Sequence, residues 1–212
     1  MMRLNELKEK YDQLQEIYGD NSLNSIYFGG CAHNPDLCLV FMNPTARNIA
    51  AFREWKGQRA PWIGTKNVWH LFYEIGLIGA DIYLQINSKK GKEWTEDFAD
   101  LVYKEVEKNK FYVTNLAKCT QLDARELSDD VYLQYLDLFM EEMKLVKPKK
   151  IILFGNQVSS IVLGEKISVS KVRRKKFYKD GLLFYSVYYP VGNGIFNMDK
   201  AIEDILYIKN SN

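Results

Sequence analysis

The sequence lacks the patterns that would assign it directly to several large functional classes. No apolar stretch approaches the ~20 residues that span a bilayer, and neither a GxGxxG nor a GxxxxGK[ST] phosphate loop is present. Dinucleotide binding and P-loop chemistry therefore have no support. The GxSxG nucleophile elbow and a metal-ligand spacing are also missing, so an unrelated α/β enzyme of small-molecule metabolism remains only the weakest of three hypotheses.

Cysteine is scarce, and neither sign of charge dominates. The three cysteines, Cys31, Cys38 and Cys119, are an odd number, which suits a reducing compartment better than a disulfide framework. With 29 Lys and Arg against 27 Asp and Glu, the net charge is only +2. Any contact with nucleic acid must therefore come from a local basic patch and not from the net charge of the whole chain.

The first 19 residues predict a charged amphipathic helix. Leu4, Leu7, Tyr11 and Leu14 recur at helical spacing, and Gly19 is a plausible stop. Such a segment does not have the composition of a secretory signal. We therefore expect a cytoplasmic protein with no membrane contact.

Apolar runs that alternate with helical stretches predict the fold class. A chain of 212 residues with 47% hydrophobic content can form one domain over residues 1–212. Because the strands read as continuous apolar runs, we expect a three-layer α/β/α sandwich around a mostly parallel sheet of four or five strands. The expected strands are 37–42, 110–114, 150–155 and 182–188; the expected helices are 4–19, 68–75, 96–109, 129–146, 156–163 and 198–208.

Two parts of the chain are ambiguous or irregular in pattern. Residues 82–86 alternate loosely and are followed by a polar turn at 87–91, so the region 81–94 is interpreted as a small insertion. Residues 189–196 are expected to form a loop before the last helix.

Polar side chains follow the expected strands. The run Leu39–Met42 ends in Asn43–Pro44, and Asn115 follows the strand at 110–114. In open α/β sheets, ligands bind outside the carboxyl ends of the strands. These asparagines therefore predict a site at that edge.

Several segments carry a resemblance to a known family. Met42–Pro44 is similar to the Gly-Met-Asn-Pro-Gly and Gly-Ile-Asn-Pro-Gly first motifs of single-strand-selective and mismatch-specific uracil-DNA glycosylases. Arg59–Gly64 resembles the Arg-Pro-Phe-Val-Gly segment of the family 4 enzymes, and Val113–Cys119 resembles their Asn-Val-Val-Lys-Cys segment. Residues 147–164 look like the strand and helix that precede the last motif of these enzymes. At the position of that last motif, which is usually His-Pro-Ser, this chain has Tyr188–Val191. Taken in order, the chain from 28 to 208 resembles the uracil-DNA glycosylase superfamily.

The resemblance implies roles for three residues in base excision. A flipped base needs its Watson–Crick edge read by hydrogen bonds and its ring held on an aromatic face. The Asn115 amide, with one acceptor and two donors, can pair with uracil O4 and N3–H and oppose cytosine. Asn43 is expected to hold the attacking water, and Trp62 is expected to stack on the base.

Each of these residues also has a simpler structural interpretation. Asn115 and Asn43 can serve turns, and Trp62 can be a core residue. Thr45 replaces the glycine that commonly follows the proline, so we expect it to narrow the base pocket or alter substrate choice.

Tyr189 departs most from the family pattern. The histidine of the resembling motif donates a hydrogen bond to uracil O2 as negative charge builds, and loss of such a donor costs about 10²- to 10³-fold in rate. Tyrosine also donates, but its hydroxyl reaches a different point. The sequence leaves a slow site, a retuned site and an inactive site open.

DNA contacts are expected from two segments near the carboxyl end of the chain. A basic run suits phosphates, although it can equally be a solvated loop. The following loop can place an apolar wedge in the minor groove. The candidate DNA-binding residues are Lys171, Arg173, Arg174, Lys175, Lys176, Asn193, Ile195 and Phe196.

The cysteines do not complete an iron–sulfur site. The family 4 cluster uses four cysteines, and Cys119 matches one of them, but Cys31 and Cys38 are too far apart and no fourth cysteine exists. We therefore expect buried free thiols, no cluster and no bound metal.

The two stronger hypotheses are of different classes. The first is a monofunctional, monomeric glycosylase that removes uracil or another deaminated base from DNA, with Asn43 and Tyr189 as catalytic residues. The alternative is a superfamily member that binds a nucleobase, nucleotide or nucleic acid without cleavage. The departures at Thr45, Tyr189 and Val191 motivate the alternative.

Overall fold

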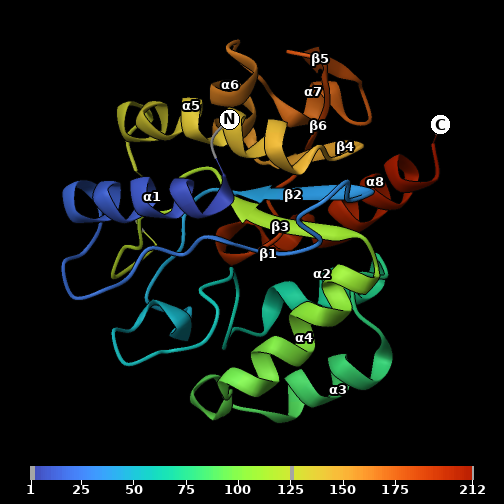
Figure 1. Cartoon of the computed structure of the whole chain (residues 1–212). Coiled ribbons are helices and arrows are strands. Elements are labelled where there is room, and N and C mark those ends of the chain that lie inside the picture. Colours follow the sequence, from blue (N-terminus) through green and yellow to red (C-terminus); the bar gives the residue numbers. More distant parts are fainter. Residues whose placement is uncertain (1–2, 125–126, 212) are drawn as a thin grey trace.

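The computed structural model describes residues 3–124 and 127–211, and these residues build an α/β protein around one mixed, mostly parallel sheet (Figure 1). The sheet has six strands in the order β1-β3-β2-β4-β6-β5. Its four central strands run parallel, and a short antiparallel strand lies at each edge. The strands are β1 (Phe28–Gly30), β2 (Leu37–Phe41), β3 (Phe111–Asn115), β4 (Lys150–Phe154), β5 (Phe177–Lys179) and β6 (Leu182–Val187).

Helices cover both faces of this sheet, in line with the predicted α/β/α layers. One face packs against α1 (Leu4–Tyr18), α5 (Asp129–Val146) and α6 (Asn156–Leu163); in Figure 1, α1 lies level with β2, and α5 and α6 lie in the upper part of the view. The opposite face packs against the remaining long helices, which include α2 and α4 below the sheet. These helices are α2 (Asn67–Glu74), α3 (Ala80–Ser88), α4 (Glu96–Lys108) and α8 (Met198–Asn210); the four-residue α7 (Val169–Val172) lies near the last strands.

Two differences from the predicted elements have simple physical causes. The predicted sheet had four or five strands, whereas β1 and β5 raise the number to six; each has only three residues, too few to show a period. The region 81–94, interpreted from the sequence as a small insertion, contains the helix α3 except for its first residue. Its buried Ile82 and Ile86 are four residues apart, the spacing of one helical face.

The loop after β6 also contains more structure than predicted, because residues 192–197 form a 3-10 helix. The predicted helix over residues 1–19 corresponds to α1, and residues 1–2 lie outside the described residues.

The topology gathers four loops at one edge of the sheet. The chain passes from β2 to β3 on one side and then crosses to β4 on the other side, so β2 lies at a reversal of strand order. Ligands of open α/β sheets bind at such a point, outside the carboxyl ends of the strands. Asn43, Asn115 and Tyr189 therefore follow or end strands at one edge.

The three cysteines, Cys31, Cys38 and Cys119, are buried free thiols, as expected.

Among the described residues, no helix is both long and apolar enough to cross a membrane.

Candidate functional site

Phe41, the last residue of β2, is the centre of an aromatic cluster at the carboxyl edge. Its ring stacks on Phe154 at 4.3 Å between centroids. The Trp62 ring meets it edge-on at 4.9 Å and the Tyr189 ring at 6.4 Å. The structure therefore brings the predicted stacking residue and the predicted hydrogen-bond donor to one aromatic platform, formed by the rings of Phe41, Phe154, Trp62 and Tyr189.

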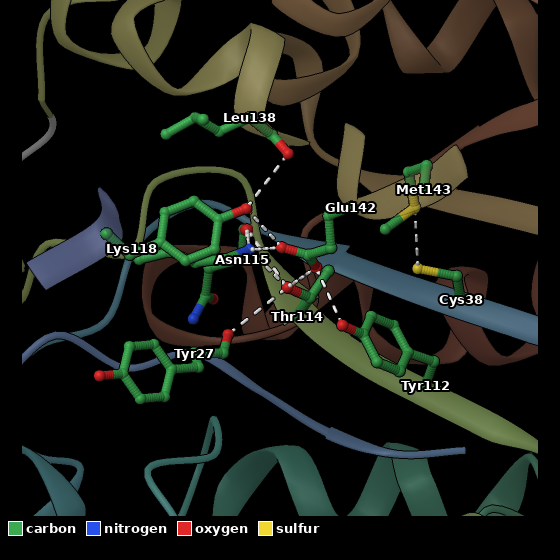
Figure 2. A network of polar contacts seen from close by, with 10 residues as sticks. Tyr27, Cys38, Tyr112, Thr114, Asn115, Lys118, Leu138, Glu142 and Met143 are labelled. Carbon is green, nitrogen blue, oxygen red and sulfur yellow. Dashed lines mark hydrogen bonds and ion pairs between the residues drawn. The ribbon is translucent and has the colours of Figure 1, made fainter. Parts of the chain in front are cut away.

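Asn115 ends the neighbouring strand at the same level. It is the register partner of Phe41, and the backbone N–H of Leu116 donates to the carbonyl of Phe41. Side chains alternate along a strand, so Asn115 follows Val113 onto the face that carries Phe41. In Figure 2 its side-chain amide points away from the polar network on the other face of β3.

The Asn115 amide has a donor without an acceptor. The residue is only 2% exposed, and its Nδ2 atom is buried with no hydrogen-bond partner in the described chain. An unpaired buried donor costs about 1–3 kcal/mol. A carbonyl oxygen supplied by a ligand would remove that cost.

Trp62 is held in a conformation that tryptophan rarely adopts. Its φ is +69°, in the left-handed region, and such strain costs of order 1 kcal/mol or more. The carbonyl of Trp62 fixes the turn, because it accepts from Trp69 Nε1 at 3.2 Å and from Thr65 Oγ1 at 2.8 Å. The half-buried indole has its own Nε1 buried without a partner in the described residues. Strain and an unpaired donor thus coincide at the predicted stacking residue.

Tyr189 carries a neutral hydroxyl at neutral pH. Burial raises the pKa of Tyr189 to about 12, so its hydroxyl keeps its proton. The following loop folds back onto this residue, and Gly194 allows the close approach. A Cβ at Gly194 would lie 2.1 Å from the carbonyl oxygen of Tyr189.

Asn43 is oriented differently from the other predicted site residues. Its Oδ1 accepts a hydrogen bond from the hydroxyl of Tyr132 at 2.8 Å, and its Nδ2 donates to the carbonyl of Pro44. Tyr132 belongs to α5 and to the core of the opposite face. The amide oxygen keeps one free lone pair for a water molecule.

Both contacts of Thr45 described below are with the backbone of neighbouring loop residues. It forms a parallel bridge with Gln121, and its Oγ1 accepts from the backbone N–H of Arg47 at 3.4 Å. The bridge connects the loop after β2 to the loop after β3.

The members of the basic run differ in burial and in their contacts with α8. Arg173 and Arg174 both donate to Asp204 of α8, with Nε to carboxylate distances of 2.8 Å, and both also pair with Glu203. Lys171, Lys175 and Lys176 are exposed. The two arginines therefore anchor α8, and any phosphate contact from them has to compete with these ion pairs.

The predicted wedge loop is open to solvent. Asn193, Ile195 and Phe196 are exposed, and the Phe196 side chain is 91% exposed. Lys200 lies 5.4 Å from the ring of Tyr188, which adds a cation near the loop.

The ion pairs of α8 lead to a testable stability difference. Asp204 is fully buried and accepts charge-assisted hydrogen bonds from two arginines, whereas the side chain of Glu203 is 62% exposed. We expect Asp204→Asn to lower the free energy of unfolding by roughly 2 kcal/mol. Glu203→Gln, the control, should have a much smaller effect in urea unfolding; equal effects would contradict this assignment.

A buried ion pair behind Asn115 was not predicted. Lys118 and Glu142 are fully buried, and Lys118 Nζ lies 3.0 Å from Glu142 Oε2 (Figure 2). Tyr11 and Thr114 each donate to the Glu142 carboxylate at 2.7 Å, and Tyr112 donates at 3.2 Å. Burial lowers the pKa of Lys118, and the Glu142 charge opposes that shift.

This network reaches the candidate site through the backbone. Lys118 Nζ donates to the carbonyl oxygen of Asn115 and to Thr114 Oγ1. The sequence contains a signal for it, because Glu142 lies on the apolar face of α5 with Tyr135, Phe139 and Val146. A carboxylate on such a face needs a buried partner.

Two neighbouring cavities lie elsewhere; they share Gly57 and Arg59, and only the smaller of the two is lined by the edge strand β1. One of about 330 Å³ is lined by residues that include Lys8, Tyr27 and Arg59, and one of about 490 Å³ is lined by residues that include Asp12 and Arg59. None of the predicted base-contacting residues lines either cavity. Within the described chain, no group of three or more His, Cys, Asp or Glu residues could hold a metal ion. A search of the sequence against protein-family models finds no match.

Proposed function

We propose that this chain is a uracil-DNA glycosylase-like protein that takes a flipped base at the carboxyl edge of its sheet. Its proposed substrate is DNA that contains uracil or another deaminated base, and its reaction is hydrolysis of the N-glycosidic bond. The protein is proposed to act as a monomer in base excision repair.

The observation that carries this proposal is the unpaired amide of Asn115 beside the aromatic platform. Asn115 Nδ2 and Trp62 Nε1 are both buried donors that find no acceptor among residues 3–124 and 127–211, and both belong to residues next to Phe41. A nucleobase offers carbonyl acceptors on its edge and a flat ring for aromatic contact. Uracil fits Asn115 because Nδ2 can donate to O4 while Oδ1 accepts from N3–H.

The proposed chemistry needs little proton abstraction. As the bond between C1′ and the base nitrogen breaks, the electron pair leaves with the base and the sugar becomes oxocarbenium-like. Tyr189 donates a hydrogen bond to uracil O2 as negative charge builds there. Asn43, oriented by Tyr132, uses its remaining lone pair to hold the water that adds to C1′. The proton that this water loses neutralises the departing base anion, directly or through solvent.

The direct test is an excision assay. The purified chain is incubated with single- and double-stranded oligonucleotides that carry uracil, hypoxanthine or xanthine, and alkali-labile sites are measured. We expect strand breaks at the position of at least one of these bases. An absence of breaks on every substrate at high protein concentration would reject the hydrolase.

A second candidate is binding without cleavage, and the orientation of Asn43 favours it. Its acceptor oxygen already receives the Tyr132 hydroxyl, and Tyr189 replaces the histidine of the resembling motif. A nucleobase, nucleotide or nucleic acid would then occupy the platform without reaction.

Replacing Tyr189 with histidine separates the two candidates. Under the second candidate, Tyr189→His restores the donor of the resembling motif and cleavage appears where the parent chain shows none. The measurement is the same alkali-labile assay on both proteins. Cleavage by the parent chain at the same rate as by the variant would reject the second candidate.

A further inference from the structure

The cavity of about 330 Å³ beside β1 has a lining with one sign of charge. Its charged lining residues are Lys8 of α1 and Arg59, and no carboxylate is among the lining residues. The neighbouring cavity shares Arg59 but is also lined by Asp12 and Glu16. Of these two cavities, the smaller one therefore has only positively charged side chains among its charged lining residues.

Lys8 is a cation without a charged partner. Its ammonium lies 5.5 Å from the centroid of Tyr27 and 5.4 Å from that of Phe28, and no carboxylate pairs with it in the described residues. Burial lowers the pKa of Lys8, and the positive charge of Arg59 lowers it further. An anion between the two cations would relieve this repulsion.

Arg59 is fixed in place with donors to spare. Its Nη2 donates to Asp12 at 3.1 Å, and its guanidinium lies 4.1 Å from the Tyr27 centroid. Ser25 Oγ accepts weakly from Nη1 at 3.5 Å. A guanidinium has five N–H groups, so three remain without a described partner.

We infer that this cavity binds a phosphate group between Lys8 and Arg59. Arginine presents a planar fork that suits phosphate oxygens, and lysine adds a mobile point charge. The inference stands apart from the proposed base site, because it requires no nucleobase and no cleavage.

The cavity also lies close to the candidate base site in the fold. Tyr27 directly precedes β1, whose Phe28 is the register partner of Thr114, the residue before Asn115. Arg59 lies three residues before Trp62 on the same loop. A phosphodiester of a bound strand is therefore one source of the phosphate, and a free phosphate group is the other.

The test follows backbone amide NMR signals of the full chain during titration with inorganic phosphate at constant ionic strength. We expect saturable shifts at Gly29, Gly30 and Ala32, which line the cavity. Lys8→Gln should weaken binding about tenfold, because one of two charge-assisted contacts is lost. Lys10→Gln removes an exposed charge from the same helix and serves as the control.

A second titration identifies the source of the phosphate. An undamaged single-stranded oligonucleotide that competes with inorganic phosphate supports a phosphodiester ligand. Phosphate binding without such competition supports a free phosphate group at the same site. Equal phosphate affinity of Lys8→Gln and Lys10→Gln, or no shift at the three cavity amides, overturns the inference.

Discussion

Replacing Asn115 with aspartate is expected to reduce excision of uracil by roughly 10²- to 10³-fold, the loss that follows removal of one preorganised donor. The carboxylate has no N–H for uracil O4 and places a negative charge beside that oxygen. Cytosine carries an amino group at the same position, so the carboxylate accepts from it. Uracil excision slows while cytosine excision becomes easier, so the ratio of the two rates should fall by a larger factor than the rate of uracil excision alone. The measurement is the release of each base from matched oligonucleotides.

Two controls distinguish a loss of base recognition in Asn115→Asp from a loss of folding. Because Asn115 is 2% exposed, aspartate there also risks destabilising the chain, so circular dichroism must show that the variant is folded at the assay temperature. Asn87→Asp makes the same chemical change at an exposed position of α3 and should leave both rates unchanged. A folded Asn115→Asp protein with unchanged uracil excision would contradict the role of this amide.

Replacing Glu142 with glutamine is expected to lower the free energy of unfolding by about 3–5 kcal/mol, which is typical when one partner of a buried ion pair is removed. Lys118 has no exposed surface, so its ammonium would lose its counter-charge without gaining water. The hydroxyls of Tyr11 and Thr114 would exchange a charged acceptor for a neutral one. Urea unfolding followed by circular dichroism measures the change.

Neighbouring residues provide the controls for this prediction. Glu141→Gln removes an exposed partner of Lys144 on the same helix and should change stability little. The double variant Lys118→Met with Glu142→Gln removes both charges, so it should recover much of the stability lost in Glu142→Gln. Equal unfolding midpoints for Glu141→Gln and Glu142→Gln would contradict the account of the network.

The long elements of the fold could be predicted because their patterns extend over many residues. The helix at Asp129–Val146 and the helix at Asn156–Leu163 have the bounds that the apolar periodicity indicates. The edge strands β1 and β5 were missed because three residues carry no period and Gly29–Gly30 indicates a break. Helix α3 was ambiguous because only Ile82 and Ile86 of its nine residues are buried.

The candidate site could be predicted in its location but not in its contacts. Residues at strand ends converge because parallel strands share one carboxyl edge, and this places Asn115 beside Phe41. The partner of Asn43 is Tyr132, 89 positions away, and nothing local indicates that hydrogen bond. Likewise, nothing local in the sequence indicates partners for Arg173 and Arg174. Their carboxylate partners, Glu203 and Asp204, are consecutive residues of α8 about 30 positions away.

The central claim is that the carboxyl edge between Trp62 and Asn115 holds a nucleobase. A crystal structure of the chain soaked with uracil tests it most directly. We expect base-shaped density against the Trp62 ring, with Asn115 Nδ2 at about 2.7–3.2 Å from uracil O4. Density for uracil away from these residues, or an empty edge at saturating uracil, would contradict the account.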